Sequence, residues 1–332
     1  MNHADSVADA VVAAYRALPP RGGKPQTRSN SRCAHLTRYE WTVLAGIVLL
    51  IEDKYIPIAI ATGVKCQPYC RISPHGDVLH DSHAEVLARR AARAWLLERI
   101  SAESQQEFGD IPPIFCRTNS RWRLCDSASL HWYVSTLPCG NASAHLFRKG
   151  DESVNFTGGL RRGRDDVCTD ALLRTKPGRR DAPPSISMSC SDKMCMWNML
   201  GIQGAIMSHW VEPIRVKSLT ICNGDAGALE ACRNAIFKRV GGPPVTVHST
   251  HVEYAHSLDR VQAHVESETG IQRDSPEWPN VEPVSCAASI IWRRGRKSEN
   301  ILGGVKQGAA RGQNEVLPRS AWCVATYLVV CV

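Results

Sequence analysis

Residues 41–53, WTVLAGIVLLIED, and residues 55–63, YIPIAIATG, decide the fold of this chain. Both runs are rich in β-branched and other apolar residues, so we expect two strands. The first run is apolar on both of its faces, which is typical of a strand in the middle of a sheet that is covered on both sides. Neither run reaches the ~20 apolar residues that a membrane-spanning helix needs, so no membrane helix is predicted.

Residues 83–100, HAEVLARRAARAWLLERI, predict a helix after these strands. Apolar residues recur on one side of it, and most of the arginines lie elsewhere. Further elements are expected along the chain: a short helix at 11–18, strands at 131–138, 214–222 and 286–292, and a buried helix at 190–210. Strands that alternate with helices indicate an α/β sandwich in which helices cover the faces of a sheet.

The composition is that of an ordinary globular protein. Hydrophobic residues make up 43% and charged residues 22% of the 332 positions, which excludes wholesale disorder and a collagen-like fibre. Forty Lys and Arg against thirty-two Asp and Glu give a net charge of +8, which favours a polyanionic partner. The first ten residues lack a basic and then apolar start, so we expect no secretory or mitochondrial leader and a cytoplasmic or nuclear protein with reduced cysteines.

Two short motifs carry the candidate chemistry. His83-Ala84-Glu85 opens the predicted helix, and Pro138-Cys139-Gly140 closes a predicted strand. H-x-E followed by P-C-x-x-C is the signature of zinc deaminases that act on nucleobases. A neutral imidazole and thiolates at helix N-termini suit Zn²⁺, since the positive end of a helix favours the thiolate. Three protein ligands leave one position for water, whose pKa zinc lowers to about 7, and Glu85 lies close enough to move its proton.

The third ligand departs from the short motif, because Ala142 stands where the second cysteine is expected. Cys190, at the start of the apolar stretch, reproduces the placement at a helix N-terminus, and we expect it to complete the site. Cys195 is the main competitor, but it would lie inside the helix, where the helix dipole helps less. A second set imitates a zinc-knuckle spacing, but its surroundings are typical of a loop and we expect no metal there: Cys66, Cys70, His75 and His80.

These motifs, together with SCSDK at 189–193, WN at 197–198 and GIQG at 201–204, resemble the adenosine deaminases that act on RNA. The resemblance implies a cytidine-deaminase-like α/β fold, a three-layer sandwich with a central mixed sheet and helices on its faces. It implies conversion of adenosine to inosine, with zinc on His83, Cys139 and Cys190 and with Glu85 as proton shuttle. LRTKPGR at 173–179 resembles the tRNA-specific members, so we expect tRNA as partner and, as target, the adenosine 3′ of the anticodon in alanine tRNA.

The resemblance also implies a buried inositol hexakisphosphate. The matching positions are Arg89, Arg90, Ser187, Lys193, Trp197, Gln203 and Lys306. Arginines next to a core helix would be costly if they were buried without a counter-charge, and a polyanion would remove that cost. Asp81, Lys176 and Lys193 are expected to relay hydrogen bonds between the zinc site and the polyphosphate. Met196 stands where relatives carry arginine, which removes one phosphate contact.

We divide the chain into residues 1–40, a helix with a flexible basic arm, and residues 41–332, the deaminase domain. Relatives continue past the position of Val332, so we expect the domain to be shortened at its C-terminus. Because only about forty residues precede Trp41, we expect no double-stranded-RNA-binding module before the deaminase domain. Three basic runs, at 161–164, 174–180 and 293–297, are expected to be exposed, where they either contact phosphates or only solubilise loops.

Two other functions stay open. A zinc-stabilised RNA-binding protein without turnover is possible, but a purely structural zinc site would not need Glu85. A cytidine deaminase is the third possibility, and the long gap between Cys139 and Cys190 argues against it. The sequence indicates no protein partner.

Overall fold

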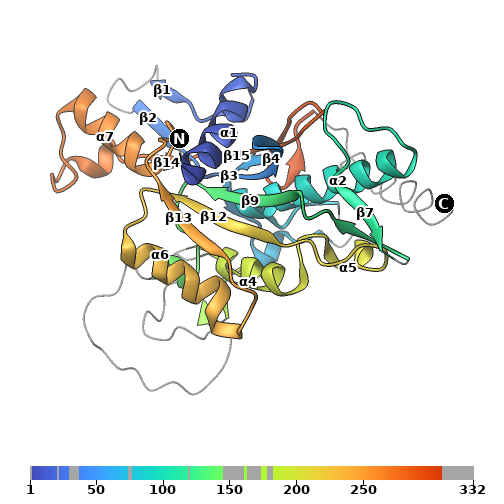
Figure 1. Ribbon diagram of the computed structural model, residues 1–332. Coiled ribbons are helices and arrows are strands. Elements are labelled where there is room, and N and C mark those ends of the chain that lie inside the picture. The colour runs from blue at the N-terminus through green and yellow to red at the C-terminus, as the bar shows by residue number, and fades with distance from the viewer. Residues whose placement is uncertain are drawn as a thin grey trace.

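The computed structural model describes residues 2–20, 22–29, 37–73, 77–118, 120–144, 161–162, 173–177 and 182–308. Within these residues, eight strands form one sheet in the order β13-β12-β9-β3-β4-β15-β16-β17 (Figure 1). They are β3 (Leu44–Ile51), β4 (Lys54–Thr62), β9 (Ala128–Val134), β12 (Val216–Cys222), β13 (Thr246–Thr250), β15 (Ala288–Arg293), β16 (Glu299–Leu302) and β17 (Val305–Lys306). β9, β12 and β13 run parallel and the other neighbours run antiparallel, so the predicted mixed sheet is confirmed.

The strand expected at the centre of the sheet lies there. β3 pairs with β4 on one side and with β9 on the other. Its side chains alternate between two cores: Leu44 and Val48 pack with the N-terminal helix, whereas Ala45, Ile47 and Leu49 pack on the opposite face. A continuous apolar run is therefore needed in this strand, because both of its faces are covered.

Helices on the two faces complete the three layers. α1 (His3–Ala17) covers one face, and α2 (Ala84–Ser104), α4 (Cys190–Leu200) and α6 (Ala226–Cys232) cover the other. α1 begins earlier than predicted, because the Asn2 side chain caps it by accepting a hydrogen bond from the Asp5 amide. Gly46 lets α1 approach the sheet closely, since a Cβ at this position would lie 2.6 Å from Val11 Cγ2.

The prediction of one buried helix over residues 190–210 is wrong. α4 ends at Leu200, because Gly201 has a φ of +88° and its amide closes the last turn on the Trp197 carbonyl. A second, short helix, α5 (Gly204–Met207), follows. The stretch is not buried on all sides either, since Met196 is 48% and Leu200 64% exposed.

Smaller elements surround the main sheet. α7 (Leu258–Thr269) packs on β2, in a sheet formed by β1 (Thr27–Ser29), β2 (Thr37–Trp41) and β14 (Val284–Ser285). Three two-stranded pairs are β5 (Val64–Cys66) with β6 (Asp81–His83), β7 (Phe115–Thr118) with β8 (Arg121–Leu124), and β10 (Arg161–Arg162) with β11 (Arg174–Thr175). The short helices are η1 (Tyr69–Arg71), α3 (Asn141–Ala144), η3 (Arg233–Phe237), η4 (Lys238–Val240) and η5 (Trp278–Asn280). No helix in the described part of the chain has the length and apolarity to cross a membrane.

The N-terminal helix is not separate from the rest of the protein. Val7, Val11 and Tyr15 of α1 are buried against the main sheet. The boundary at residue 40 stays a prediction. The prediction of a flexible arm is wrong for residues 27–29, which form β1 and pair with β2. Residues 30–36 and 309–332 lie outside the described residues.

Candidate active site

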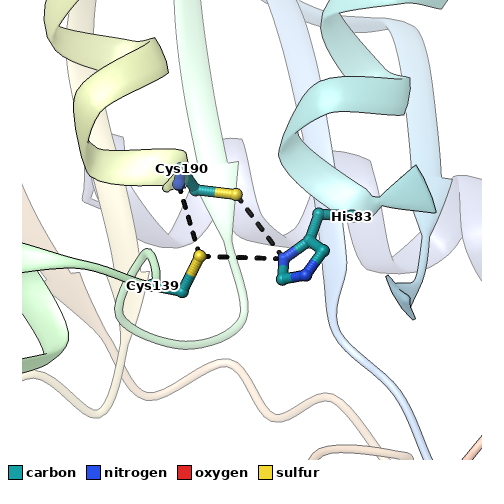
Figure 2. Close-up of side chains that lie close together, drawn as sticks. All are labelled: His83, Cys139 and Cys190. Atoms are coloured by element: carbon teal, nitrogen blue, oxygen red, sulfur yellow. Dashed lines mark hydrogen bonds between the residues drawn. The ribbon is translucent and has the colours of Figure 1, made fainter. Parts of the chain in front are cut away.

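Three side chains from distant parts of the chain converge at the ends of three elements (Figure 2). His83 ends β6 and precedes α2, Cys139 lies in the loop after β9, and Cys190 begins α4. His83 Nδ1 lies 3.9 Å from Cys139 Sγ and 3.6 Å from Cys190 Sγ. In the described part of the chain these residues form the only group with metal-ligand geometry. They could therefore hold a metal ion.

The local backbone explains why the two cysteines meet. The Cys190 amide, at the N-terminus of α4, donates a hydrogen bond to Cys139 Sγ over 3.3 Å. Gly140 allows this approach: its φ is +105°, and a Cβ there would lie 2.2 Å from Ser189 Oγ. The hydrogen bond from the Cys190 thiol holds the pKa of the Cys139 thiol well below its ordinary value. One sulfur of the pair is therefore ready to act as a thiolate.

Glu85 lies in the first turn of α2 and is buried. Its Oε2 atom has no hydrogen-bond partner among the described residues, although most buried carboxylate oxygens have one. Burial raises the pKa of Glu85, despite the nearby His83. A buried carboxyl group with a free oxygen and a raised pKa is suited to accept and return a proton.

A network of charged side chains contacts His83 and Cys190. Lys176 Nζ donates to Cys190 Sγ over 3.2 Å and to Asp81 Oδ2 over 2.7 Å. Lys193 also donates to Asp81 Oδ2, and the other oxygen of Asp81 accepts from the His83 amide over 3.0 Å. Although burial opposes it, Lys176, His83 and Lys193 hold the pKa of Asp81 well below its ordinary range. The network thus ties the histidine strand to the Cys190 side of the site.

Arg89 lies one turn further along α2, in a position where its charge is poorly balanced. Its guanidinium carbon lies 4.5 Å from the centre of the Trp197 ring, and its buried Nε has no hydrogen-bond partner among the described residues. Burial, and then the neighbouring Arg93, lower the pKa of Arg89 to about 9. A polyanion next to this arginine would offset the cost of burying its positive charge and raise its pKa again.

The other predicted polyanion ligands have different roles as they lie here. Both ends of the Gln203 amide contact the backbone, with Nε2 donating to the Leu200 carbonyl and Oε1 accepting from the Ile214 amide. Lys306 Nζ pairs with Glu299 at 3.0 Å. Ser187 is buried, and its amide donates to Ser185 Oγ.

The alternative metal ligands do not join the site. Cys195 is buried within α4 and does not belong to the metal-ligand group of the described residues. Cys66 and Cys70 do not belong to it either, and His75 lies outside the described residues.

The expectation that residues 174–180 are exposed is wrong for their described part. Arg174 and Lys176 are fully buried, because each charge has polar partners: Arg174 Nε donates to Asn141 Oδ1 over 2.5 Å, and Lys176 pairs with Asp81. Residues 178–180 lie outside the described residues.

In the run 293–297, Arg293 and Arg296 contact Glu98, and Arg294 contacts Asp110. Much of that run's positive charge is therefore matched. Of the first run, residues 163–164 lie outside the described residues.

One buried ion pair near the site was not predicted. Arg239 donates to Asp192 Oδ1 over 2.5 Å, and both side chains are buried. Asp192 also accepts from the Ser189 hydroxyl and the Arg174 amide, so it holds the first turn of α4 in place. The SCSDK motif singles out Asp192, but nothing in the sequence connects it with an arginine 47 positions later.

The chain is similar in sequence to several known proteins. The chain is 38% identical over 213 residues to tRNA-specific adenosine deaminase 1 of Schizosaccharomyces pombe, covering 60% of this chain and 53% of that protein. It is 32% identical over 251 residues to the Drosophila melanogaster protein of the same name, covering 70% and 58%. Double-stranded RNA-specific editase B2 of Mus musculus is 33% identical over 203 residues, covering 54% and 26%.

The chain thus spans a little over half the length of these tRNA deaminases. The family model of the adenosine-deaminase (editase) domain matches residues 59–328. This range includes the metal-ligand group, Glu85 and the charged network of Asp81, Lys176 and Lys193. The chain therefore belongs to the adenosine-deaminase (editase) domain family.

Proposed function

We propose that this chain is a zinc-dependent hydrolase that converts adenosine to inosine in tRNA. The observation that carries the proposal is the convergence of His83, Cys139 and Cys190 beside the buried Glu85. The names of the relatives support adenosine in tRNA as the substrate.

Zinc fits the donor set. Bonds of about 2.0–2.1 Å to nitrogen and about 2.3 Å to sulfur place nitrogen and sulfur roughly 3.5 Å apart around a tetrahedral ion. The 3.6 Å and 3.9 Å between His83 Nδ1 and the two sulfurs are close to this value. His83 and Cys139 are partly exposed, so water and substrate could reach an ion that these residues hold. When bound there, the ion would supply a Lewis acid that makes water nucleophilic near neutral pH.

Glu85 then moves the protons. Its unpaired Oε2 takes a proton as water adds to C6 of the adenine ring and delivers it to N1. A second transfer through the same carboxyl group protonates the amino group, which leaves as ammonia, and inosine remains. The raised pKa of Glu85 suits both directions, because the carboxyl group must gain and lose a proton in each turnover.

Asp81 and Lys176 act as positioning residues. Asp81 accepts from the His83 amide and from Lys176, and Lys176 donates to Cys190 Sγ. Hydrogen bonds to ligating groups fix their orientation, and the loss of such a bond commonly costs 10–100-fold in metal affinity or activity.

We infer that the target is the adenosine 3′ of the anticodon of alanine tRNA. A loop adenosine is already unpaired, so moving it into the site costs less than flipping it out of a duplex. Residues 177–181, PGRRD, offer no counterpart to the side chain with which relatives acting on duplex RNA fill the vacated space. Residues 178–181 lie outside the described residues, so this point rests on sequence alone.

Inositol hexakisphosphate is the second proposed cofactor. Arg89 supports it, because this buried guanidinium lies near Arg93 and has an unpartnered Nε. Native mass spectrometry of the protein from a eukaryotic host should show one bound inositol hexakisphosphate per chain, and Arg89→Met should lose it. A wild-type chain that carries no phosphate would contradict this part of the proposal.

The function is tested by incubating zinc-loaded protein with an alanine tRNA transcript and measuring inosine by mass spectrometry of the nucleosides. Inosine is expected 3′ of the anticodon, and Glu85→Gln should lower its rate of formation by at least about 10²-fold while zinc stays bound. Absence of inosine with one zinc per chain would favour an RNA-binding protein without turnover. Uridine formation from cytidine would favour a cytidine deaminase.

A further inference from the structure

A short two-stranded ribbon forms one wall of the candidate site. Its strands are residues 173–177, which include β11, and residues 185–189, which lead into α4. They run antiparallel: the Lys176 amide donates to the Ser187 carbonyl and the Ser189 amide to the Arg174 carbonyl, both over 2.7 Å. Successive side chains therefore point to opposite faces of the ribbon.

In most proteins apolar side chains point inward and polar ones outward, but this ribbon has buried polar side chains and exposed apolar ones. The side chains that point inward are all polar and all buried: Arg174, Lys176, Ser185, Ser187 and Ser189. On the outward face, Leu173 is 52% and Ile186 54% exposed. The polar inner face is explained, because Lys176 contacts the Cys190 sulfur. The site does not explain why Leu173 and Ile186 are exposed on the outer face, which also carries the half-buried Thr175 and Met188.

An exposed aromatic residue adjoins the same ribbon. Tyr69 begins the one-turn helix η1 and is 67% exposed. Its amide donates to the Pro184 carbonyl over 2.8 Å, which fixes η1 beside the strand that carries Ile186. Arg71, in the same turn, is exposed and adds a positive charge. Tyr69 and Ile186 form what we call the rim surface.

The mixture of groups on and beside the rim surface favours one class of partner. Exposed apolar side chains that lie next to one another can mark a contact surface, and the hydrogen bond between Tyr69 and Pro184 brings Tyr69 next to the strand that carries Ile186. A nucleic-acid strand with unpaired bases offers flat apolar faces for Tyr69 and Ile186, together with phosphates for Arg71. Aromatic stacking beside positive charge is the general means by which proteins hold single strands.

The position of the rim surface agrees with this partner. Cys66, at the end of β5, lies opposite Asp81 in the pairing of β5 with β6, and β6 ends at His83 of the metal-ligand group. Tyr69 follows Cys66 by three residues. If a single-stranded nucleic acid has one nucleotide at the metal-ligand group, the adjacent nucleotides would therefore lie along the ribbon.

We propose that the rim surface stacks on the unpaired bases that flank the edited adenosine in the tRNA loop. This inference rests on the proposed function. The side chains of the rim surface do not touch the reacting atoms, so they act in binding and positioning. Tyr69 contributes most, since its ring can stack on any base.

The test compares Tyr69→Ala and Ile186→Ser with the unaltered protein in steady-state deamination of an alanine tRNA anticodon stem-loop. Tyr69→Ala should raise KM about ten-fold, the effect of losing ~1.4 kcal/mol of stacking, and Ile186→Ser should raise it about three-fold. In both variants kcat should stay within about two-fold of the unaltered protein. Tyr69→Phe should restore KM, because stacking needs the ring and not the hydroxyl group.

Two matched variants control for the loss of exposed apolar area. Phe108→Ala removes an exposed aromatic residue beyond the end of α2, a 21-residue helix about 30 Å long that begins at the site. Ile206→Ser removes an equally exposed isoleucine from α5. Neither variant should change KM.

Binding measured without turnover separates this inference from the proposed function. In the Glu85→Ala background, fluorescence anisotropy with the same stem-loop should show the ten-fold loss on adding Tyr69→Ala. If the parent protein makes inosine but Tyr69→Ala leaves both KM and affinity unchanged, the rim surface does not bind the loop. Absence of inosine with the parent protein would instead count against the proposed function, and the binding measurement would still decide for or against the rim surface.

Discussion

Two histidines, His83 and His131, lie on opposite sides of the main sheet and have different surroundings. His83, on the face covered by α2 and α4, lies among two sulfurs and Asp81. His131 lies on β9 under α1, where its Nδ1 is 2.8 Å from Ser218 Oγ and its Nε2 is 2.9 Å from Ser129 Oγ. One histidine is set among ionisable partners, and the other among hydroxyl groups.

The hydroxyl contacts of His131 belong to a longer chain. Ser218 Oγ also lies 3.1 Å from His3 Nε2, and His3 Nδ1 lies 3.0 Å from the Tyr55 hydroxyl. A neutral imidazole donates at one nitrogen and accepts at the other, so this chain is satisfied without any charge. Burial of a titratable residue therefore does not by itself mark a catalytic site. The site is marked by its concentration of charges and by the unpaired oxygen of Glu85.

The largest expected effect comes from removing one sulfur of the charged face. Cys190→Ala should lose bound zinc and all measurable deamination, because two ligands cannot hold the ion tightly. Stability should fall by several kcal/mol, since structural zinc contributes about 10 kcal/mol or more in small zinc domains. Metal analysis and denaturant unfolding check both results. Cys195→Ala, in the same helix, is the matched control and should keep its zinc. Stoichiometric zinc in Cys190→Ala would show that another residue is the ligand.

The next effect distinguishes the two lysines that share Asp81. Lys176 is fully buried, whereas the Lys193 side chain is 19% exposed. Lys176→Met should destabilise the protein by about 3–5 kcal/mol, because Asp81 then loses the one lysine partner that is itself fully buried. Lys193→Met should cost no more than about 1–2 kcal/mol, since water can replace part of that contact. Urea unfolding of both variants measures the difference, and equal losses would contradict the assignment of Lys176 as the main partner.

The charged face could largely be predicted from sequence, because its residues occur in short motifs with fixed helical positions. His83 and Glu85 lie two positions apart at a helix start, and Cys190 was identified by its place at the next helix start. The end of α4 was missed, because apolar periodicity continues past Gly201 and only the backbone angle at this glycine reveals the break.

The neutral face could not be predicted in the same way. His3 and His131 are 128 positions apart, and their meeting depends on where α1 docks and on the register of β9 against β12. The inward turn of Arg174 and Lys176 was missed for a similar reason, since a basic run is usually exposed. Arg174 and Lys176 can be buried because Asn141 and Asp81, which lie on other elements, pair with them.

The neutral face should be the more sensitive to acid. Burial, and then His3, Lys217 and His248, lower the pKa of His131 to about 4, and burial also lowers the pKa of His3 and of His248. The ionisable groups around the chain are Asp5 on α1, Tyr55 on β4, Lys217 on β12, His248 on β13 and Arg233 on η3. The unfolded chain binds protons at these histidines more readily than the folded chain. Stability is therefore complete above pH 6.5 and falls as pH drops toward about 4.

Between pH 6.5 and 4, protonation of His131 should lower the free energy of unfolding by on the order of 2 kcal/mol. Zinc held by the proposed ligands would also be released in acid, so the two contributions to the loss of stability must be separated. His131→Gln supplies the comparison: its stability should depend less on pH than that of the unaltered protein, while zinc release is the same in both. Hydrogen exchange should show α1 opening before α2. Identical pH profiles for the two proteins would contradict the role given to His131.

The smallest expected effect tests how closely α1 fits the neutral face. In Gly46→Ala, the new Cβ would lie 2.6 Å and 2.8 Å from the two methyl groups of Val11, so α1 or the strand must shift. Overpacking of this kind costs about 1–3 kcal/mol, and the better strand propensity of alanine offsets part of it, which leaves a net loss of about 1–2 kcal/mol. Thermal unfolding measures this loss.

A double-mutant cycle isolates the contact from other effects of the substitution. Val11→Ala removes both methyl groups that the new Cβ would meet, so the double variant should be less destabilised than the sum of the two single variants. Additive losses would mean that the cost arises elsewhere in β3. Because Gly46 lies on the strand between the two cores, zinc content should stay unchanged in all three variants, since the strain is confined to the face that holds no metal ligands.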